Sequence, residues 1–138
     1  MLACLSSVHS LGTAFAAGNA TSLLGLGVGD QEAMLKLSTL AHAETERFPN
    51  LEATVTTGEY TPGGVNKQHA HLDCLEIIFV IQGAISTQIE GEGTTITRAG
   101  EVICIQPDIL HRGRNASGSD PAKLVIVKLK KRGAATTA

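Results

Sequence analysis

The hydrophobic pattern along residues 51–130 has the period of β-strands rather than of helices. Residues 51–57 (LEATVTT) alternate apolar and polar side chains, which is typical of a half-buried strand. Residues 77–81 (IIFVI) are all β-branched or aromatic, which indicates a strand covered on both faces. Further strands are expected at 84–90, 94–98, 101–106 and 123–130.

Turns rich in glycine and proline separate these expected strands. They fall at residues 61–64, at 91–93 and at 99–100, with loops expected at 107–110 and 115–121. Gly83 ends the apolar run at a point where a tight turn needs positive φ. Short strands that recur at a spacing of about ten residues are typical of an antiparallel sandwich or barrel. The predicted fold class is therefore all-β.

The chain before residue 51 is less regular. Asp30 is placed to cap a short helix over residues 31–37, whereas the alternation of residues 35–39 favours an edge strand, and both alternatives stand. Residues 1–29 contain no Lys, Arg, Asp or Glu and are rich in Ala, Gly, Ser and Leu. We therefore divide the chain into a leader (1–29), one β-barrel domain (30–132) and a tail (133–138).

The leader has some features of an export signal. Residues 14–16 (AFA) form a small-x-small triplet of the kind that precedes a signal-peptidase site, but the usual positive charge before the apolar stretch is missing. We interpret the segment as a degraded or truncated signal; a disordered leader or an unsuitable start codon is the alternative. The protein is accordingly expected in the cytoplasm, or in the periplasm or outside the cell if residues 1–16 direct export.

Length and composition limit the possible partners. A chain of 138 residues with a net charge of −2 fits one domain with a sizeable core. With no Trp and one Tyr, it lacks the basic-aromatic surface that binds single-stranded nucleic acid. No apolar run reaches the roughly 18 residues of a spanning helix. We expect neither nucleic acid nor a membrane as partner, and interpret the basic cluster as a solvated strand end: Lys128, Lys130, Lys131 and Arg132.

The three cysteines, Cys4, Cys74 and Cys104, show no CxxC spacing. An odd number without that spacing argues against a disulfide framework and against a structural zinc knuckle. Cys104 lies in an apolar strand and is expected to be a small buried hydrophobe. Cys74 lies between His71 and Glu76, where a loop position is favoured over a role in chemistry.

Two histidines and a glutamate precede or begin the 77–81 strand. His69 and His71 are two residues apart, so on an extended strand both imidazoles leave the same face. Glu76 follows after a short bend. Neutral imidazole and carboxylate together suit a divalent transition metal, so these residues are interpreted as half of a metal site.

His111 follows the 101–106 strand, and its setting completes a known pattern. Together the two segments resemble the paired motifs of the cupin superfamily, G(X)5HXH(X)3–4E(X)6G and G(X)5PXG(X)2H(X)3N. The first motif is matched at every spacing, by Gly63, His69, His71, Glu76 and Gly83. The ends of the second are matched by Gly100, His111 and Asn115. In between, the chain departs: Pro107 is one residue late, and Asp108 stands where the family often has Gly.

The resemblance implies a small single-domain cupin (a monocupin) whose barrel over 30–132 is a double-stranded β-helix, or jelly roll. It also implies that His69, His71, Glu76 and His111 bind one divalent metal, from among Fe, Mn, Ni, Cu and Zn. Three imidazoles and one carboxylate leave two positions open on a six-coordinate ion for water, dioxygen or a chelating substrate. Histidines merely tolerated in a core would each need a buried partner of their own.

The resemblance favours a metal-dependent enzyme that acts on a small organic molecule, with oxidative, dioxygenase-type chemistry. Glu76 would be catalytic as well as a ligand if it accepts a proton. The alternatives are a non-catalytic module that binds a metal or small ligand, and a non-redox lyase or isomerase, which would need a Tyr, Lys or Glu inside the barrel. Polar contacts to the ligand are expected from this set: Tyr60, Gln82, Arg98 and Arg112.

The strand at 77–81 also predicts an assembly. If Glu76 points inward, Ile78 and Val80 line the barrel, and the outward row is Ile77, Phe79 and Ile81. Three large apolar side chains in one row need a covering layer. Because proteins of the cupin family commonly dimerise, the resemblance implies a homodimer, and we expect Phe79 near its centre.

Overall fold

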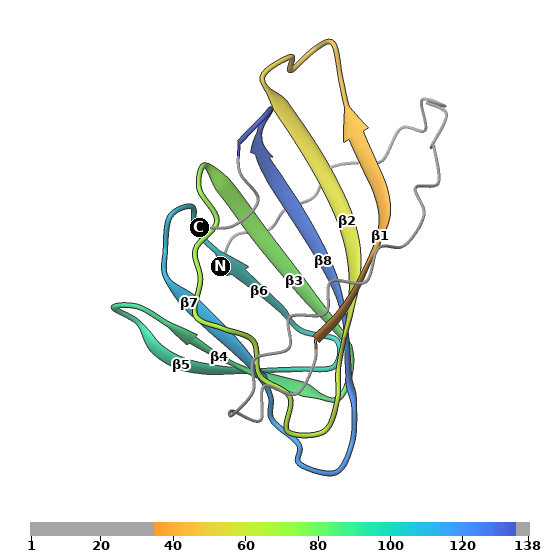
Figure 1. The fold of residues 1–138 in the computed structure, drawn as a ribbon, viewed down its shortest axis with the longest axis vertical. Helices are drawn as coiled ribbons and strands as arrows, with labels where there is room; N and C mark the ends of the chain where they lie inside the picture. The colour runs from red at the N-terminus through yellow and green to blue at the C-terminus, as the bar shows by residue number, and fades with distance from the viewer. Residues whose placement is uncertain (1–34, 135–138) are drawn as a thin grey trace.

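A computed structural model describes residues 35–134, which form two antiparallel β-sheets (Figure 1). Within this range every regular element is a strand, and no helix is long and apolar enough to cross a membrane. The all-β prediction is confirmed. The strands are β1 (Leu35–Glu44), β2 (Leu51–Tyr60), β3 (Cys74–Gln82), β4 (Ala84–Ile89), β5 (Gly93–Arg98), β6 (Val102–Ile105), β7 (His111–Asn115) and β8 (Ala122–Lys131).

The larger sheet has the order β1-β2-β8-β3-β6 and the smaller one β5-β4-β7. The last strand, β8, lies between β2 and β3 at the centre of the large sheet, and β1 and β6 form its two edges. In Figure 1 the small sheet crosses below the large one. Gly83, at φ +76°, makes the turn that takes the chain from β3 in one sheet to β4 in the other, as its position at the end of the apolar run predicts.

The core lies between the two sheets. It is built from side chains that alternate along each strand: Tyr60, Ile78, Val80, Ile85, Ile89, Ile105, Ala122, Leu124 and Ile126. Ile78 and Val80 are buried, and Ile77, Phe79 and Ile81 face the other way, in agreement with the pattern. Burying such aliphatic side chains contributes roughly 1.5–3 kcal/mol each.

Several local predictions need correction. Leu35 to Leu37 are in β1, so the edge-strand alternative holds there and a helix over these residues is wrong. Strand β7 was not expected, because its sequence, HRGRN, has polar side chains on both faces. Cys104 is exposed on the outward face of β6 rather than buried. The expected leader and the end of the tail lie outside the described residues, and the domain boundaries remain predictions.

Candidate metal centre

His69 and His71 lie on the connection between β2 and β3, which contains turns and isolated bridges and is not a regular strand. The expectation that both stand on one strand is therefore wrong in detail. His69 is held instead by an isolated bridge to His111 at the start of β7. Each residue donates its backbone N–H to the other's carbonyl, at 2.9 Å. This bridge joins the connection before β3 to the start of β7. It therefore brings the two halves of the motif together, although strands β3 to β6 lie between them in the sequence.

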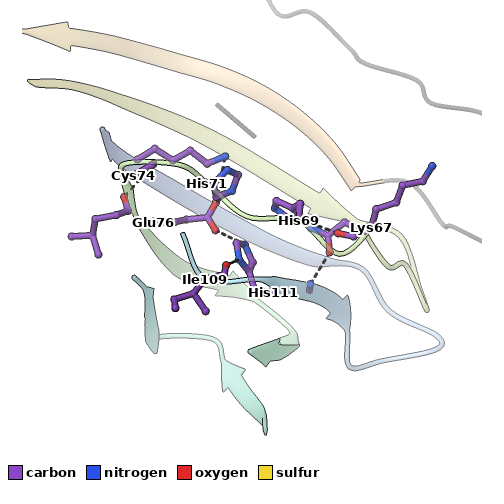
Figure 2. Close-up of polar contacts among 11 residues, drawn as sticks. Lys67, His69, His71, Cys74, Glu76, Ile109 and His111 are labelled. Atoms are coloured by element: carbon purple, nitrogen blue, oxygen red, sulfur yellow. Dashed lines mark hydrogen bonds and ion pairs between the residues drawn. The ribbon is translucent and has the colours of Figure 1, made fainter. Parts of the chain in front are cut away.

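The three imidazoles converge, as Figure 2 shows. Their ring centroids are 4.8 Å apart for His69 and His71, 4.4 Å for His69 and His111, and 5.3 Å for His71 and His111. One nitrogen from each ring lies within 4.8 Å of the other two. His71 and His111 are buried, and His69 is half-buried. Such a cluster of nitrogen donors on the inside of a barrel is the donor set of a transition-metal site.

Backbone carbonyls fix the orientation of two of the rings. Nδ1 of His69 donates to the Lys67 carbonyl and Nδ1 of His111 donates to the Ile109 carbonyl, each at 2.8 Å. A carbonyl only accepts hydrogen bonds, so in the neutral rings the proton stays on Nδ1 and the lone pair stays on Nε2. This is the arrangement in which metal-binding histidines are usually held. The residues present therefore fit a divalent metal.

Glu76 is on β3, on the same inward face as Ile78 and Val80. Its carboxylate lies 3.3 Å from Nε2 of His71 and 3.2 Å from Nε2 of His111. It thus reaches two of the three imidazoles and completes the predicted set of four residues (Figure 2). The structure brings all four side chains to one place.

The charges at this centre are coupled. Burial alone would raise the pKa of Glu76, but contacts with His111, His71 and Lys128 outweigh it, and the pKa is lowered. Burial alone would lower the pKa of His111, but the contact with Glu76 raises it overall. For His69 burial prevails, and its pKa is lowered. The metal-free centre therefore favours the carboxylate form of Glu76, and it favours the protonated form of His111 more than an ordinary histidine setting does.

The loop before His111 explains the departure from the family pattern. Asp108, at the position where a Gly is often found, adopts φ +65°, a conformation that Asp tolerates better than most residues. Its N–H donates to the His71 carbonyl and its carboxylate accepts the Asp73 N–H, both at 3.0 Å. Asp108 thus keeps the glycine-like backbone and also links the two loops that carry the histidines.

Lys128, which was expected to be solvated, is the main residue that the sequence analysis missed. It is opposite Glu76 in the β3–β8 pairing, and its ammonium lies 3.5 Å from the Glu76 carboxylate with the side chain only 15% exposed. Lys130 is also buried, where it binds Glu52 at 2.6 Å. The available signal was the alternation of β8, which places residues 124, 126, 128 and 130 on one face.

Two hydroxyl groups add polarity to the barrel interior. Tyr60 is buried, and burial, together with the charge of Glu76, raises its pKa, so the phenol stays protonated. Thr87 is 1% exposed, and no described residue forms a hydrogen bond with its hydroxyl.

Cys74 also faces inward, two residues from Glu76, and burial raises the pKa of its thiol, so it is a poor nucleophile. The other three expected polar contacts are exposed, outside this centre: Gln82, Arg98 and Arg112.

A second group of metal-binding residue types lies on the outer edge of the large sheet: His42, Glu44 and Glu52. Both carboxylates already have cationic partners, Lys130 for Glu52 and Arg132 for Glu44, at 2.6 and 2.9 Å. Because these partners neutralise the carboxylates, the interior cluster remains the candidate metal centre.

Comparison with known proteins identifies the family. Residues 56–128, more than half of the chain, match the family model described as the cupin domain. The chain belongs to the cupin family. This cupin is 30% identical over 95 residues to germin-like protein 5-1 of Oryza sativa subsp. japonica, a match that covers 64% of this chain and 42% of that relative. It thus spans less than half the length of the curated relative.

Solved structures agree on the fold. An uncharacterised conserved protein with a double-stranded β-helix domain from Klebsiella pneumoniae aligns with a TM-score of 0.61 at 19% identity, over 80% of this chain and 83% of that one. An oxalate oxidase in complex with the substrate analogue glycolate aligns with a TM-score of 0.53 at 23% identity, over 60% of this chain and 44% of that one. The predicted double-stranded β-helix is confirmed. Taken together, the comparisons support a cupin enzyme or a metal-binding cupin module.

Proposed function

We propose that this cupin is a metal-dependent enzyme that acts on a small organic molecule by oxidative, dioxygenase-type chemistry. The observation that carries the proposal is the convergence of three imidazoles and one carboxylate inside the barrel, with two of the imidazoles held by carbonyls at Nδ1. His69, His71, Glu76 and His111 would hold one divalent ion, from among Fe, Mn, Ni, Cu and Zn. When bound, such an ion acts as a Lewis acid and, if it is redox-active, as an electron carrier.

The protein's own residues would supply orientation and exclude water. The carbonyls of Lys67 and Ile109 fix two ligand rings, and the aliphatic interior around Ile78 and Val80 limits access of water. Glu76 would act as a proton acceptor when it loosens from the ion, through carboxylate oxygens that lie 3.3 Å from Nε2 of His71 and 3.2 Å from Nε2 of His111. We propose it as the catalytic residue as well as a ligand.

The test is metal analysis of protein purified without oxygen, followed by oxygen-uptake measurements over oxalate, small enols, diketones and phenols. Oxygen consumption that depends on the bound metal and is lost in His71→Ala would support the proposal. Stoichiometric metal and tight ligand binding without turnover would instead identify a non-catalytic binding module. Oxalate belongs in the screen because a structurally similar protein is an oxalate oxidase.

A second candidate is a non-redox lyase or isomerase. The observation that favours it is the presence of Tyr60 and Lys128 inside the barrel, the residue types that such chemistry needs near the metal. Product formation from an enol or hydroxy acid without oxygen uptake would distinguish it from the oxidative enzyme.

We also propose that the protein is a homodimer formed through the outer face of the large sheet. Phe79 pairs with Val102 on one side and Val125 on the other, so the apolar row continues across neighbouring strands. Phe79, Val102 and Leu129 are 41%, 53% and 41% exposed. Single exposed apolar residues are ordinary, but a continuous apolar sheet face is not.

A further inference from the structure

Lys128 is a cation that the sheet holds against the candidate metal centre. Strands β3 and β8 pair Glu76 directly with Lys128, so both side chains leave the same, inward face. The ammonium is 3.5 Å from a Glu76 oxygen, and the side chain is 15% exposed. Its charge also acts on His111, whose pKa it lowers against the stronger opposite effect of Glu76. A lysine this far inside a barrel requires a negative partner.

The neighbouring basic side chains form ion pairs with other carboxylates. Lys130, two residues further along the same face, binds the Glu52 carboxylate at 2.6 Å and the Ala134 carbonyl at 2.7 Å. Arg132 pairs with Glu44 at the sheet edge. Lys128 differs from both because its acidic partner, Glu76, is also a predicted metal ligand.

The charge balance at the centre shows what a bound ion would change. A divalent ion adds two positive charges, Glu76 contributes one negative charge and Lys128 contributes one positive charge. A net charge of plus two would then remain in a largely buried place, and Lys128 would share its partner with the ion. Buried charge is costly unless it is paired, so an anionic ligand is the species that completes the centre.

We propose that Lys128 is a substrate-binding residue, whose ammonium pairs with an anionic oxygen of a small carboxylate, so that the site selects carboxylates over their neutral analogues. The inference rests on the proposed function, because it assumes a metal at the four predicted ligands. It adds a residue outside both cupin motifs and a substrate class.

The experiment measures binding rather than turnover. Calorimetric titration of the metal-containing protein with glycolate, and with glycolamide as its neutral analogue, gives two affinities for each variant. Lys128→Met should weaken glycolate binding about ten-fold or more, as loss of a charged contact does, and leave glycolamide binding within about two-fold. Lys128→Arg should restore most of the glycolate affinity. Metal content is measured for every sample.

A matched control is Lys123→Met, which removes an exposed lysine from the same strand and should leave both affinities unchanged. Lys128→Gln serves as a second neutral variant if Lys128→Met does not fold. Unchanged glycolate binding in a metal-containing neutral variant would overturn the inference while the proposed function stands. So would an equal loss for glycolate and glycolamide, or equal wild-type affinity for the two. A wild-type protein that binds no divalent metal would instead overturn the proposed function, and the inference with it.

Discussion

His69 and His111 exchange two backbone hydrogen bonds, each 2.9 Å long, although β3, β4, β5 and β6 lie between them in the sequence. The pair sets the two ring centroids 4.4 Å apart. The polypeptide backbone itself, and not only a bound ion, therefore holds two predicted ligands in position. A site built in this way is largely preformed before metal binds.

Removing one imidazole should release the metal. We expect His71→Ala to lose most bound metal, because three remaining donors bind a divalent ion more weakly, and to lose the part of thermal stability that metal supplies. At a free metal concentration of about 100 times Kd, bound metal adds roughly 2.7 kcal/mol to the free energy of unfolding. Elemental analysis and thermal melts measure both effects. His42→Ala, which removes a half-exposed histidine at the sheet edge, is the control, and full metal content in His71→Ala would refute the ligand assignment.

The pH dependence of metal binding should follow from His111. Burial alone would lower its pKa, but Glu76 raises it above 6.5, so in the metal-free protein its contribution to stability is present below about pH 6.5 and is lost as pH rises through the raised pKa. The contribution of Glu76, whose pKa is lowered, is present above about pH 4.5 and is lost as pH falls. In the metal-free protein, the contact between Glu76 and His111 therefore stabilises the fold fully between about pH 4.5 and pH 6.5.

A metal needs His111 without its second proton, so metal and proton compete for this ring. We expect the increase in melting temperature on adding metal to grow as pH rises from roughly 6 to 8. The growth should continue above the pKa of about 6.5 that an ordinary histidine has. Melts with metal and with chelator across that range measure it. An increment that does not change with pH would show that His111 is not a ligand.

The sequence predicted the parts of the centre that depend on local spacing. The sequence spacings of His69, His71 and Glu76, and of Gly100 and His111, carry the resemblance to the paired cupin motifs, and that resemblance implied the four residues that the fold brings together. The alternating pattern was also enough to separate Ile78 and Val80 from the outward row. Both depend on short stretches of chain whose geometry has a fixed period.

What the sequence did not give depends on pairing between distant strands. Lys128 looked like part of a basic strand end, and only the β3–β8 register places it opposite Glu76. Strand β7 has no apolar alternation of its own, since it is held by pairing with β4 and by the bridge to His69. In the sequence, Asp108 is only a departure from the motif. Its positive φ and its two loop contacts, which depend on the fold, explain why Asp is accepted there.

The outer face of the large sheet gives a test of assembly. Phe79→Asp places a charge in the centre of the apolar row, so we expect it to convert a dimer to monomer or aggregate while metal content stays the same. Sedimentation at micromolar concentration measures the change. Ile96→Asp is a matched control, because Ile96 is as exposed as Phe79 (42% against 41%) but lies on β5 in the other sheet. A wild-type monomer, or equal dissociation by both variants, would contradict this interface.

The close approach of Tyr60 to Gly113 predicts a strong coupling inside the barrel. A Cβ at Gly113, in β7, would lie 2.5 Å from Oη of Tyr60 and 3.4 Å from its Cζ, so the clash is with the hydroxyl alone. Gly113→Ala should therefore destabilise the protein by about 1–3 kcal/mol, since a buried ring on β2 cannot move freely. Denaturant unfolding with metal removed measures this without the contribution of the metal.

The same substitution in a Tyr60→Phe background should cost about 1 kcal/mol less, because the phenyl ring leaves the Cβ an ordinary contact distance. Gly118→Ala is the control: nothing lies within 4 Å of a Cβ there, so its effect should stay within about 0.5 kcal/mol. Gly113→Ala could lower the free energy of unfolding by the same amount with Tyr60 and with Phe at position 60. In that case the Tyr60 hydroxyl is not what excludes a side chain at position 113. Coupling of the predicted sign would show that Gly113 is required so that the phenol of Tyr60 can pack against the strand that carries His111.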